Sequence, residues 1–359
     1  MGRVGTTVSA TRAARLARGV NLSHWFAQVA ADPARLDLDS GYTTLEDLRK
    51  IRALGFRHVR LPVAPEPLFN EGDPERIEGP ALAALDRALD AIAAESLAVI
   101  VDLHPAQGGP FKKRLATDDA HVRAVARFWR ALARHLSARD PEMVFLEVMN
   151  ESEVKDRRRW SDVQRTLLAA MREGAPHHTL IATGARWGSV RDLTLLEPVH
   201  DRNVVYDFHF YDPYEFTHQG ATWAVDRWSH LRSLPYPASV ERVVPALGMI
   251  GTTRAKMTAL KYGTKGWDAD LLAERLGEVS GWAARHGVRV MCGEFGALRL
   301  EAPPADRVRW LTDVRTILER ADIGWSVWDY ASEGFGIVDP TSGTARHPDP
   351  AVVRALGLR

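Results

Sequence analysis

The chain has 359 residues, of which 45% are hydrophobic and 26% are charged, a composition typical of a globular enzyme with a large core. Its formal net charge of +1 gives no general attraction to nucleic acids or anionic membranes, so we expect neither as a partner. Cys292 is the only cysteine, which excludes an intrachain disulfide and a cysteine-rich metal site.

No stretch of the sequence approaches the roughly 20 apolar residues that a membrane span requires. The segment "MGRVGTTVSATRAARLARG" at the start carries arginines but not the apolar segment of a secretory signal. We expect a secreted or periplasmic protein whose leader has been removed or, alternatively, a cytoplasmic one. We also expect it to act as a monomer.

Eight short apolar segments are predicted to form strands, and polar residues follow the C-terminal ends of most of them. In chain order they are residues 19–22, 57–61, 98–103, 143–149, 179–182, 203–208, 288–293 and 324–328.

Amphipathic helical patterns separate these strands. In the first, Thr44 can cap the N-terminus, Gly55 can follow the last turn, and Leu48 and Ile51 lie in one apolar stripe. The other predicted helices are residues 81–95, 119–137, 159–172, 268–286 and 305–320.

Strands that are joined through helices run parallel, so the pattern predicts a (β/α)8 barrel that forms a single domain over residues 1–359. An open doubly wound sheet is less well supported, because the first strand leads into "NLSHWF" and not into a glycine-rich phosphate-binding turn.

One connection, residues 211–267 after the sixth strand, is too long to be a simple turn. Long loops inside compact domains are usually lids or binding walls, so we predict an inserted loop region that walls a substrate groove. Its aromatic residues are Tyr214, Phe216, Trp223, Trp228 and Tyr236.

The C-terminal ends of barrel strands converge on one face, where active sites of such barrels lie. Polar and aromatic residues stand at most of these ends. They are Asn21, His24, Trp25, Arg60, His104, Asn150, Glu151, Trp187, His209, Tyr211, Glu294 and Trp328.

Two of these residues are carboxylates that follow similar apolar strands, Glu151 in "MVFLEVMNESE" and Glu294 in the glycine-flanked turn of "VRVMCGEFGAL". Strands four and seven lie on roughly opposite sides of an eight-strand barrel, so these side chains are predicted to face each other across its mouth. Two facing carboxylates are the minimal equipment for cleaving a glycosidic bond. Arg60 would keep one of them ionised, and Asn150 can bind a sugar hydroxyl.

Tryptophan faces stack on the apolar face of a pyranose, which suits Trp25, Trp187 and Trp328. Taken singly, each candidate also has an ordinary structural explanation. A glutamate can start a helix, Arg60 can pair with Glu147, and tryptophans can lie in the core. Their common position at one end of the strands favours a functional site.

Other chemistries have weaker support. His104, His209, Glu151 and Glu294 could gather around an ion, but the sequence has no H-E-x-x-H motif and no cysteine pair, so we expect no metal and no cofactor. A G-x-S-x-G nucleophile elbow is also absent, which disfavours acyl transfer through serine.

A series of motifs carries a family resemblance: "RGVNLSHWF", "FRHVRLP", "VIVDLH", "FLEVMNE", "YDFHFY", "VMCGEFGA" and "GWSVWDY". With these motifs the chain resembles glycoside hydrolase family 5, the cellulase-type retaining (β/α)8 glycosidases. One departure is that Ser152 follows Glu151, where the family often has proline.

The resemblance implies that Glu151 is the general acid/base and Glu294 the nucleophile. It also implies residues that surround the sugar, namely Arg60, His104, Asn150, His209, Tyr211 and Trp328; we add Trp25, Trp187 and Trp223 as substrate-binding aromatics.

The implied reaction is retaining hydrolysis of internal β-1,4-glucosidic bonds in cellulose-like glucans. Mannan, β-1,3-glucan, xyloglucan and glycolipid head groups stay open as substrates, because their recognition depends on loops. Two other hypotheses are a catalytically silent carbohydrate-binding barrel, which would be expected to lack one of the glutamates, and a cytoplasmic glycosidase that trims imported oligosaccharides.

Overall fold

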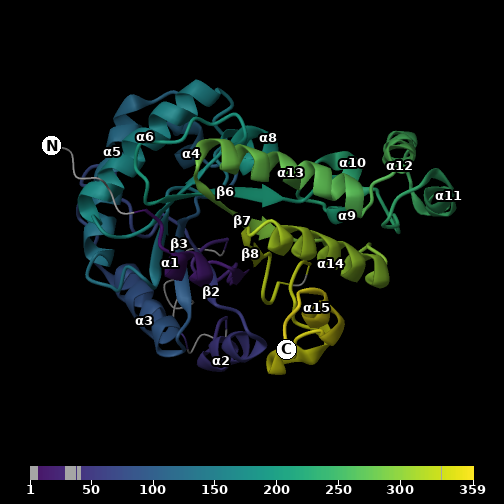
Figure 1. The fold of residues 1–359 in the computed structure, drawn as a ribbon, viewed down its shortest axis with the longest axis horizontal. Coiled ribbons are helices and arrows are strands. Elements are labelled where there is room, and N and C mark those ends of the chain that lie inside the picture. Colours follow the sequence, from purple (N-terminus) through teal and green to yellow (C-terminus); the bar gives the residue numbers. More distant parts are fainter. Residues whose placement is uncertain (1–6, 29–37, 39–41, 333) are drawn as a thin grey trace.

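A computed structural model describes residues 7–28, 38, 42–332 and 334–359 of the chain. Within them, parallel strands close into a barrel in chain order, with β1 paired to both β2 and β8 (Figure 1). This confirms the predicted (β/α)8 barrel. The strands are β1 (Arg18–Asn21), β2 (His58–Val63), β3 (Ala98–Leu103), β4 (Val144–Glu147), β5 (Leu180–Thr183), β6 (Val204–Phe210), β7 (Arg289–Phe295) and β8 (Gly324–Val327).

The sixth and seventh strands are longer than predicted. Their last residues still pair, His209 with Glu294 and Phe210 with Phe295, after a register shift next to Phe208. Glu294 therefore lies within β7 and not in a turn after it, so its backbone is fixed by the sheet.

The six predicted long helices are present: α2 (Leu45–Leu54), α3 (Pro80–Ala94), α5 (Asp119–Leu136), α6 (Arg157–Gly174), α13 (Ala269–His286) and α14 (Pro304–Arg320). Thr44 caps α2 in a reciprocal arrangement with Asp47, and Gly55 ends it with a φ of 99°, as the sequence predicts. Short helices that the sequence analysis did not predict are α1 (Ala10–Arg15), α4 (Pro110–Leu115), α7 (Ala185–Gly188), α8 (Val190–Leu193), η4 (Pro340–Ala345) and α15 (Pro350–Ala355).

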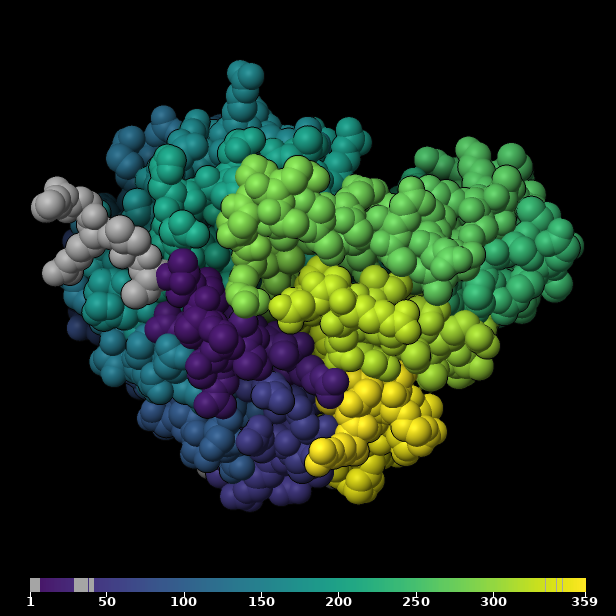
Figure 2. All heavy atoms as spheres, viewed as in Figure 1, coloured from purple at the N-terminus to yellow at the C-terminus, as the bar shows by residue number. Residues whose placement is uncertain are grey.

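The connection after β6 is largely helical and not an irregular loop. Its helices are α9 (Tyr214–Thr217), α10 (Asp226–Ser229), α11 (Val240–Val243), η3 (Val244–Met249) and α12 (Thr253–Lys265). In Figure 1, α11 and α12 lie at the far end of the molecule from the barrel, and the space-filling view shows this part as a lobe (Figure 2). Among the described residues, no helix is both long and apolar enough to cross a membrane.

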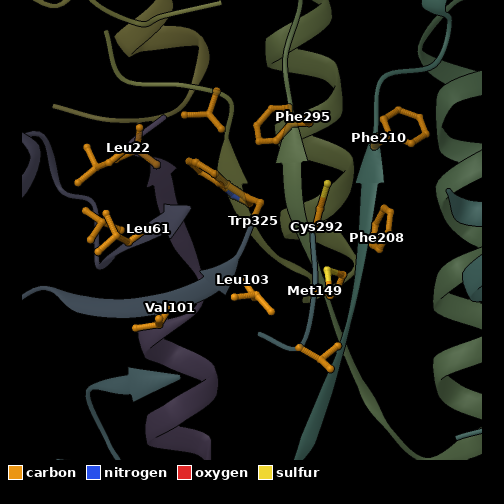
Figure 3. Packing of buried hydrophobic residues seen from close by; sticks show 14 of the residues in the cluster. Leu22, Leu61, Val101, Leu103, Met149, Phe208, Phe210, Cys292, Phe295 and Trp325 are labelled. Carbon is orange, nitrogen blue, oxygen red and sulfur yellow. The ribbon is translucent and has the colours of Figure 1, made fainter. Parts of the chain in front are cut away.

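The hydrophobic core lies mainly between the barrel and its helices. Side chains alternate between the two faces of a strand, so Val101 and Leu103 of β3 join this outer core together with Phe208 and Trp325 (Figure 3). A smaller apolar cluster contains the alternate residues of the same strands. It includes Ala98, Ile100, Phe145, Ile181, Val205 and Met291.

Above this apolar layer, the alternate positions of β2, β3 and β4 carry Arg60, Asp102 and Glu147, all fully or almost fully buried. Arg60 donates two hydrogen bonds of 2.7 Å to Glu147, and its Nη2 lies 3.0 Å from Asp102. Its Nη1 donates to Glu294 at 2.8 Å. One guanidinium thus binds three buried carboxylates and connects the barrel interior to the strand ends.

Replacing Arg60 by methionine should lower the free energy of unfolding by about 3–5 kcal/mol, because it leaves buried carboxylates without their cation. Urea denaturation monitored by circular dichroism measures this loss. Arg165→Met is the matched control, since the exposed Arg165–Asp162 pair should contribute less than about 1 kcal/mol. Equal stability of the two variants would contradict a structural role for Arg60.

His58 is a buried polar residue at the opposite end of the barrel. Its ring contacts the Arg15 carbonyl at 3.0 Å and Ser326 Oγ at 2.8 Å. Only glycine fits at position 19, because a Cβ there would lie 2.0 Å from His58 Nε2. Burial lowers the pKa of His58 to about 4, so the folded protein holds this ring neutral.

In the unfolded chain the same imidazole takes up a proton near its ordinary pKa of about 6.5. The stability that depends on neutral His58 is therefore present above pH 6.5 and is lost as the pH falls towards 4, by up to about 3 kcal/mol. Urea denaturation between these pH values should show a shallower loss for His58→Gln than for the wild type. Parallel curves would contradict this.

Candidate active site

A cavity of about 1120 Å³ lies at the C-terminal ends of the strands. Polar side chains from several strand ends line it together with aromatic side chains from the connection after β6. The polar lining includes His104, Gln107, Asn150, Glu151, Tyr211 and Glu294, and the aromatic lining includes Phe26, Trp187, Tyr214, Trp223, Trp228, Trp328 and Phe335.

The structure brings Glu151 and Glu294 together in this cavity. One oxygen of each carboxylate and one nitrogen of His209 lie within 4.8 Å of one another. Glu151 follows β4 in a left-handed backbone conformation with a φ of 42°, which few residues other than glycine adopt. Such a conformation at a polar position in a cavity is a common feature of functional sites.

Glu294 is held by two donors. Arg60 Nη1 donates to one carboxylate oxygen and the Tyr211 hydroxyl donates to the other, both at 2.8 Å. Burial raises the pKa of Glu294 to about 7, against the positive charges of His209 and Arg60, which lower it. The charges and donors therefore favour the anion, while burial opposes it.

Glu151 also has a donor at each oxygen. Gln107 Nε2 donates at 2.5 Å and His209 Nδ1 at 2.9 Å. Burial would raise the pKa of Glu151, but the hydrogen bond from His209 and the charge of its ring lower it to about 2. Burial alone would lower the pKa of His209, but Glu294, Asp207 and Glu151 raise it well above the ordinary value.

A proton donor at Glu151 would be expected to have a raised pKa, and an anion at Glu294 a lowered one. The two pKa directions found here are the opposite. The reason is His209, which carries the proton in this arrangement and donates it to Glu151 across 2.9 Å. Groups this close share their protons and titrate together. A protonated imidazole therefore lies one hydrogen bond away from the Glu151 carboxylate.

A second histidine has a different state. His104 Nδ1 lies 2.7 Å from Asp102, and its Nε2 accepts from Asn150 Nδ2 at 3.2 Å. Burial and the charge of Arg60 lower its pKa well below the ordinary value, so the ring is neutral. Asn150 Oδ1 accepts from Arg60 at 3.0 Å, which fixes the amide in one orientation.

Three of the predicted tryptophans line the cavity. Trp328 is nearly buried and stacks on His104 with ring centres 6.1 Å apart and an interplanar angle of 14°. Trp187 and Trp223 are 44% and 61% exposed, which is unusual for such large apolar rings. The backbone N–H of Trp187 donates to the backbone carbonyl of Ser152 at 2.8 Å, which ties this segment to the loop that carries Glu151.

The prediction for Trp25 is wrong. Its side chain is fully buried, packs against Phe26 with ring centres 5.0 Å apart, and does not line the cavity. The backbone before it turns at His24, which has a φ of 59°, and the indole points into the core. Phe216 and Tyr236 of the long connection are fully buried as well, whereas Tyr214, Trp223 and Trp228 line the cavity.

Sequence reasoning missed Gln107, Asp102 and Asp207. Gln107 lies in a loop, and nothing in its surroundings distinguishes it from a solvated amide. The aspartates did have a signal, because each stands two residues before a strand-end histidine, His104 or His209, and therefore on the same face of its strand.

Two groups of described residues have atoms close enough to surround a cation, namely Glu151, His209 and Glu294, and Glu147, Asp207 and His209. In the first group, protein donors already bind both oxygens of each glutamate, and hydrogen bonds and ionic contacts account for its close approach. We therefore interpret the close approach of Glu151, His209 and Glu294 as an arrangement for proton transfer and not as a metal site.

The sequence matches the family described as Cellulase (glycosyl hydrolase family 5) over residues 21–334. Endoglucanase C of Acetivibrio thermocellus is 28% identical over 324 residues, which cover 89% of this chain and 92% of that protein. Endoglucanase 3 of Fibrobacter succinogenes is 24% identical over 341 residues, covering 90% of this chain and 50% of that protein, so this chain spans half of that relative's length.

Solved structures share the fold. Cel5A of Thermotoga maritima in complex with cellobiose superposes with a TM-score of 0.74 at 21% identity, covering 96% of this chain and 98% of that chain. The same values hold for the complex of this Cel5A with mannotriose. Because the family match covers most of the chain, the protein belongs to glycosyl hydrolase family 5 and is a glycoside hydrolase of the cellulase type.

Proposed function

We propose that this protein hydrolyses internal β-1,4-glucosidic bonds of cellulose-like glucans with retention of configuration. The observation that carries the proposal is the approach of Glu151 and Glu294 to within 4.8 Å, oxygen to oxygen, in an aromatic-lined cavity. Retaining glycosidases have carboxyl groups about 5–5.5 Å apart, whereas inverting enzymes need about 6.5–9.5 Å to admit a water molecule.

In the first step Glu294 attacks the anomeric carbon and forms a covalent glycosyl-enzyme, while Glu151 protonates the departing glycosidic oxygen. Arg60 and Tyr211 hold the Glu294 carboxylate by both oxygens. These contacts fix the carboxylate in position for the attack.

In the second step Glu151, now a carboxylate, takes a proton from a water molecule that attacks the anomeric carbon and releases Glu294. Gln107, which binds one oxygen of Glu151, stands where the leaving oxygen must enter, so we infer that its side chain moves when a sugar binds.

Asn150, His104 and Trp328 border the space beside the two carboxylates, and we assign them to the sugar at the cleaved bond. Trp187 and Trp223 are exposed further out, where their faces can stack on additional sugar units. The start of the connection at residues 211–267 supplies the wall on this side, which favours binding of several sugars and cleavage within a chain.

The substrate class is supported by the relatives, two of which are named endoglucanases. A β-mannan is the second candidate, because the similar Cel5A fold was solved with mannotriose as well as with cellobiose.

A polymer of either kind cannot enter a cell intact, so we propose that the enzyme acts outside the cytoplasm.

Glu151→Gln should slow hydrolysis of cello-oligosaccharides by about 10²–10⁴-fold, because it removes the proton donor for a poor leaving group. Cleavage of a 2,4-dinitrophenyl β-cellobioside should lose much less in its first step, since this leaving group needs no proton. Burst kinetics with both substrates measures the difference. An equal loss on the two substrates would argue against the acid role.

The proposed internal cleavage predicts that the viscosity of carboxymethyl cellulose falls sharply while few reducing ends have formed. Viscometry combined with reducing-end detection measures this, and galactomannan and β-1,3-glucan in the same assay test the alternative substrates. A slow fall in viscosity with rapid release of small sugars would indicate attack at chain ends.

A further inference from the structure

The motif Asp-x-His occurs twice at the end of a barrel strand, as Asp102–His104 on β3 and Asp207–His209 on β6. Side chains two residues apart on a strand share a face, so in each case the aspartate lies one layer below the histidine inside the barrel. All four residues are nearly or fully buried. The two pairs nevertheless differ in what the histidine faces.

Asp207 is held rigidly beneath its histidine. Its Oδ1 accepts from the backbone N–H of Gly293 at 2.5 Å, and its Oδ2 lies 3.3 Å from His209 Nε2. No side chain other than hydrogen fits at Gly293, because a Cβ there would lie 2.6 Å from the Asp207 carboxylate. Among the described residues Oδ2 makes no conventional hydrogen bond, and its ionic contact is with His209.

The other nitrogen of this ring faces the reacting groups. His209 Nδ1 lies 2.9 Å from Glu151 and 3.4 Å from Glu294. The imidazole therefore connects one buried carboxylate below the cavity with the two carboxylates that line it. His104 has no such connection, because its second nitrogen binds the neutral amide of Asn150.

We propose that Asp207 is a positioning residue that acts on Glu151 through His209. Its carboxylate accepts from His209 Nε2 and stabilises the doubly protonated ring, whose second proton, on Nδ1, faces Glu151. Asp207 thereby sets the pH at which the His209–Glu151 pair loses its last transferable proton. The inference rests on the acid/base role proposed for Glu151. It adds a residue that touches neither the substrate nor Glu151.

The proton balance over a turnover is closed. The proton held by the pair leaves with the glycosidic oxygen in the first step, and the attacking water returns one proton to Glu151 in the second. Asp207 exchanges no proton with the substrate. The negative charge of Asp207 keeps the His209–Glu151 pair protonated up to a higher pH than the pair would reach without it.

Other charged groups also act on His209. Glu147 lies in the layer below, with a carboxylate oxygen within 4.8 Å of the ring and of Asp207. Asp102 lies on β3 and His104 follows it, and both interact electrostatically with His209. Lys112 of α4 and Arg60 of β2 act on the same carboxylates that face the ring. Among these groups, Asp207 is the one that contacts Nε2 directly.

The test is the pH dependence of kcat/KM for cellopentaose with Asp207→Asn. Asparagine keeps an oxygen for the Gly293 N–H but replaces the charged Oδ2 opposite His209 Nε2 with an uncharged N–H donor. The alkaline limb should therefore move to lower pH by about 1–2 units, the effect of removing one nearby charge. With 2,4-dinitrophenyl β-cellobioside, whose departure needs no acid, the alkaline limb of the variant should match that of the wild type.

Asp102→Asn is the matched control, because it removes an equally buried carboxylate from the other Asp-x-His pair. Because Asp102 acts on His209 through space and not by direct contact, this variant should move the alkaline limb for cellopentaose clearly less than Asp207→Asn does. A uniform loss of activity at every pH in Asp207→Asn, or equal shifts in the two variants, would overturn the proposal.

An NMR titration of the histidine imidazoles tests the same inference without turnover. The pKa of His209 should fall in Asp207→Asn, and an unchanged value would overturn the proposal. If the wild type hydrolyses no glycan, the proposed function fails. If it hydrolyses glycans with the expected dependence on Glu151 but the His209 pKa is unchanged in the variant, only the role of Asp207 fails.

Discussion

The burial of Arg60 among three carboxylates is the interaction on which the site depends. A guanidinium inside a barrel is tolerated only where its charge is balanced and its donors are bound. Here Glu147 and Asp102 balance it from below, while Glu294 and Asn150 accept from it at the edge of the cavity. The same side chain therefore connects the interior of the barrel to Glu294, one of the two carboxylates that we propose to react.

Above this layer, two histidines differ in protonation state. His104 and His209 stand at the ends of β3 and β6, and each has an aspartate below it. His104 faces an amide and stays neutral, whereas His209 faces two glutamates and is held protonated. The groups that face the second ring nitrogen decide which protonation state is favoured, so two histidines in similar Asp-x-His motifs differ in charge.

Much of the barrel follows from periodicity. The eight apolar segments and six long helices are visible because the pattern of each extends over enough residues, and the helix from Leu45 begins and ends where Thr44 and Gly55 predict. The short helices of the long connection are too brief to show a period, and their positions depend on packing against distant segments.

The strand-end rule located both glutamates, but it could not determine side-chain direction in a loop. Trp25 satisfies the rule and still points into the core, while Gln107 contacts Glu151 from a loop that carries no recognisable motif. The pKa shifts of the site residues could not be predicted from the sequence either. They depend on which groups lie within a few ångströms of His209, and these come from three different strands and one loop.

In the proposed mechanism, Glu294 forms a covalent bond with the sugar while Glu151 supplies the proton. Incubation with 2,4-dinitrophenyl 2-deoxy-2-fluoro-β-cellobioside, which slows release of the covalent intermediate, tests it most directly by intact-mass and peptide mass spectrometry. We predict one added fluorocellobiosyl group, located on the peptide that contains Glu294. A label on Glu151, or turnover of this reagent with inversion and no label, would contradict it.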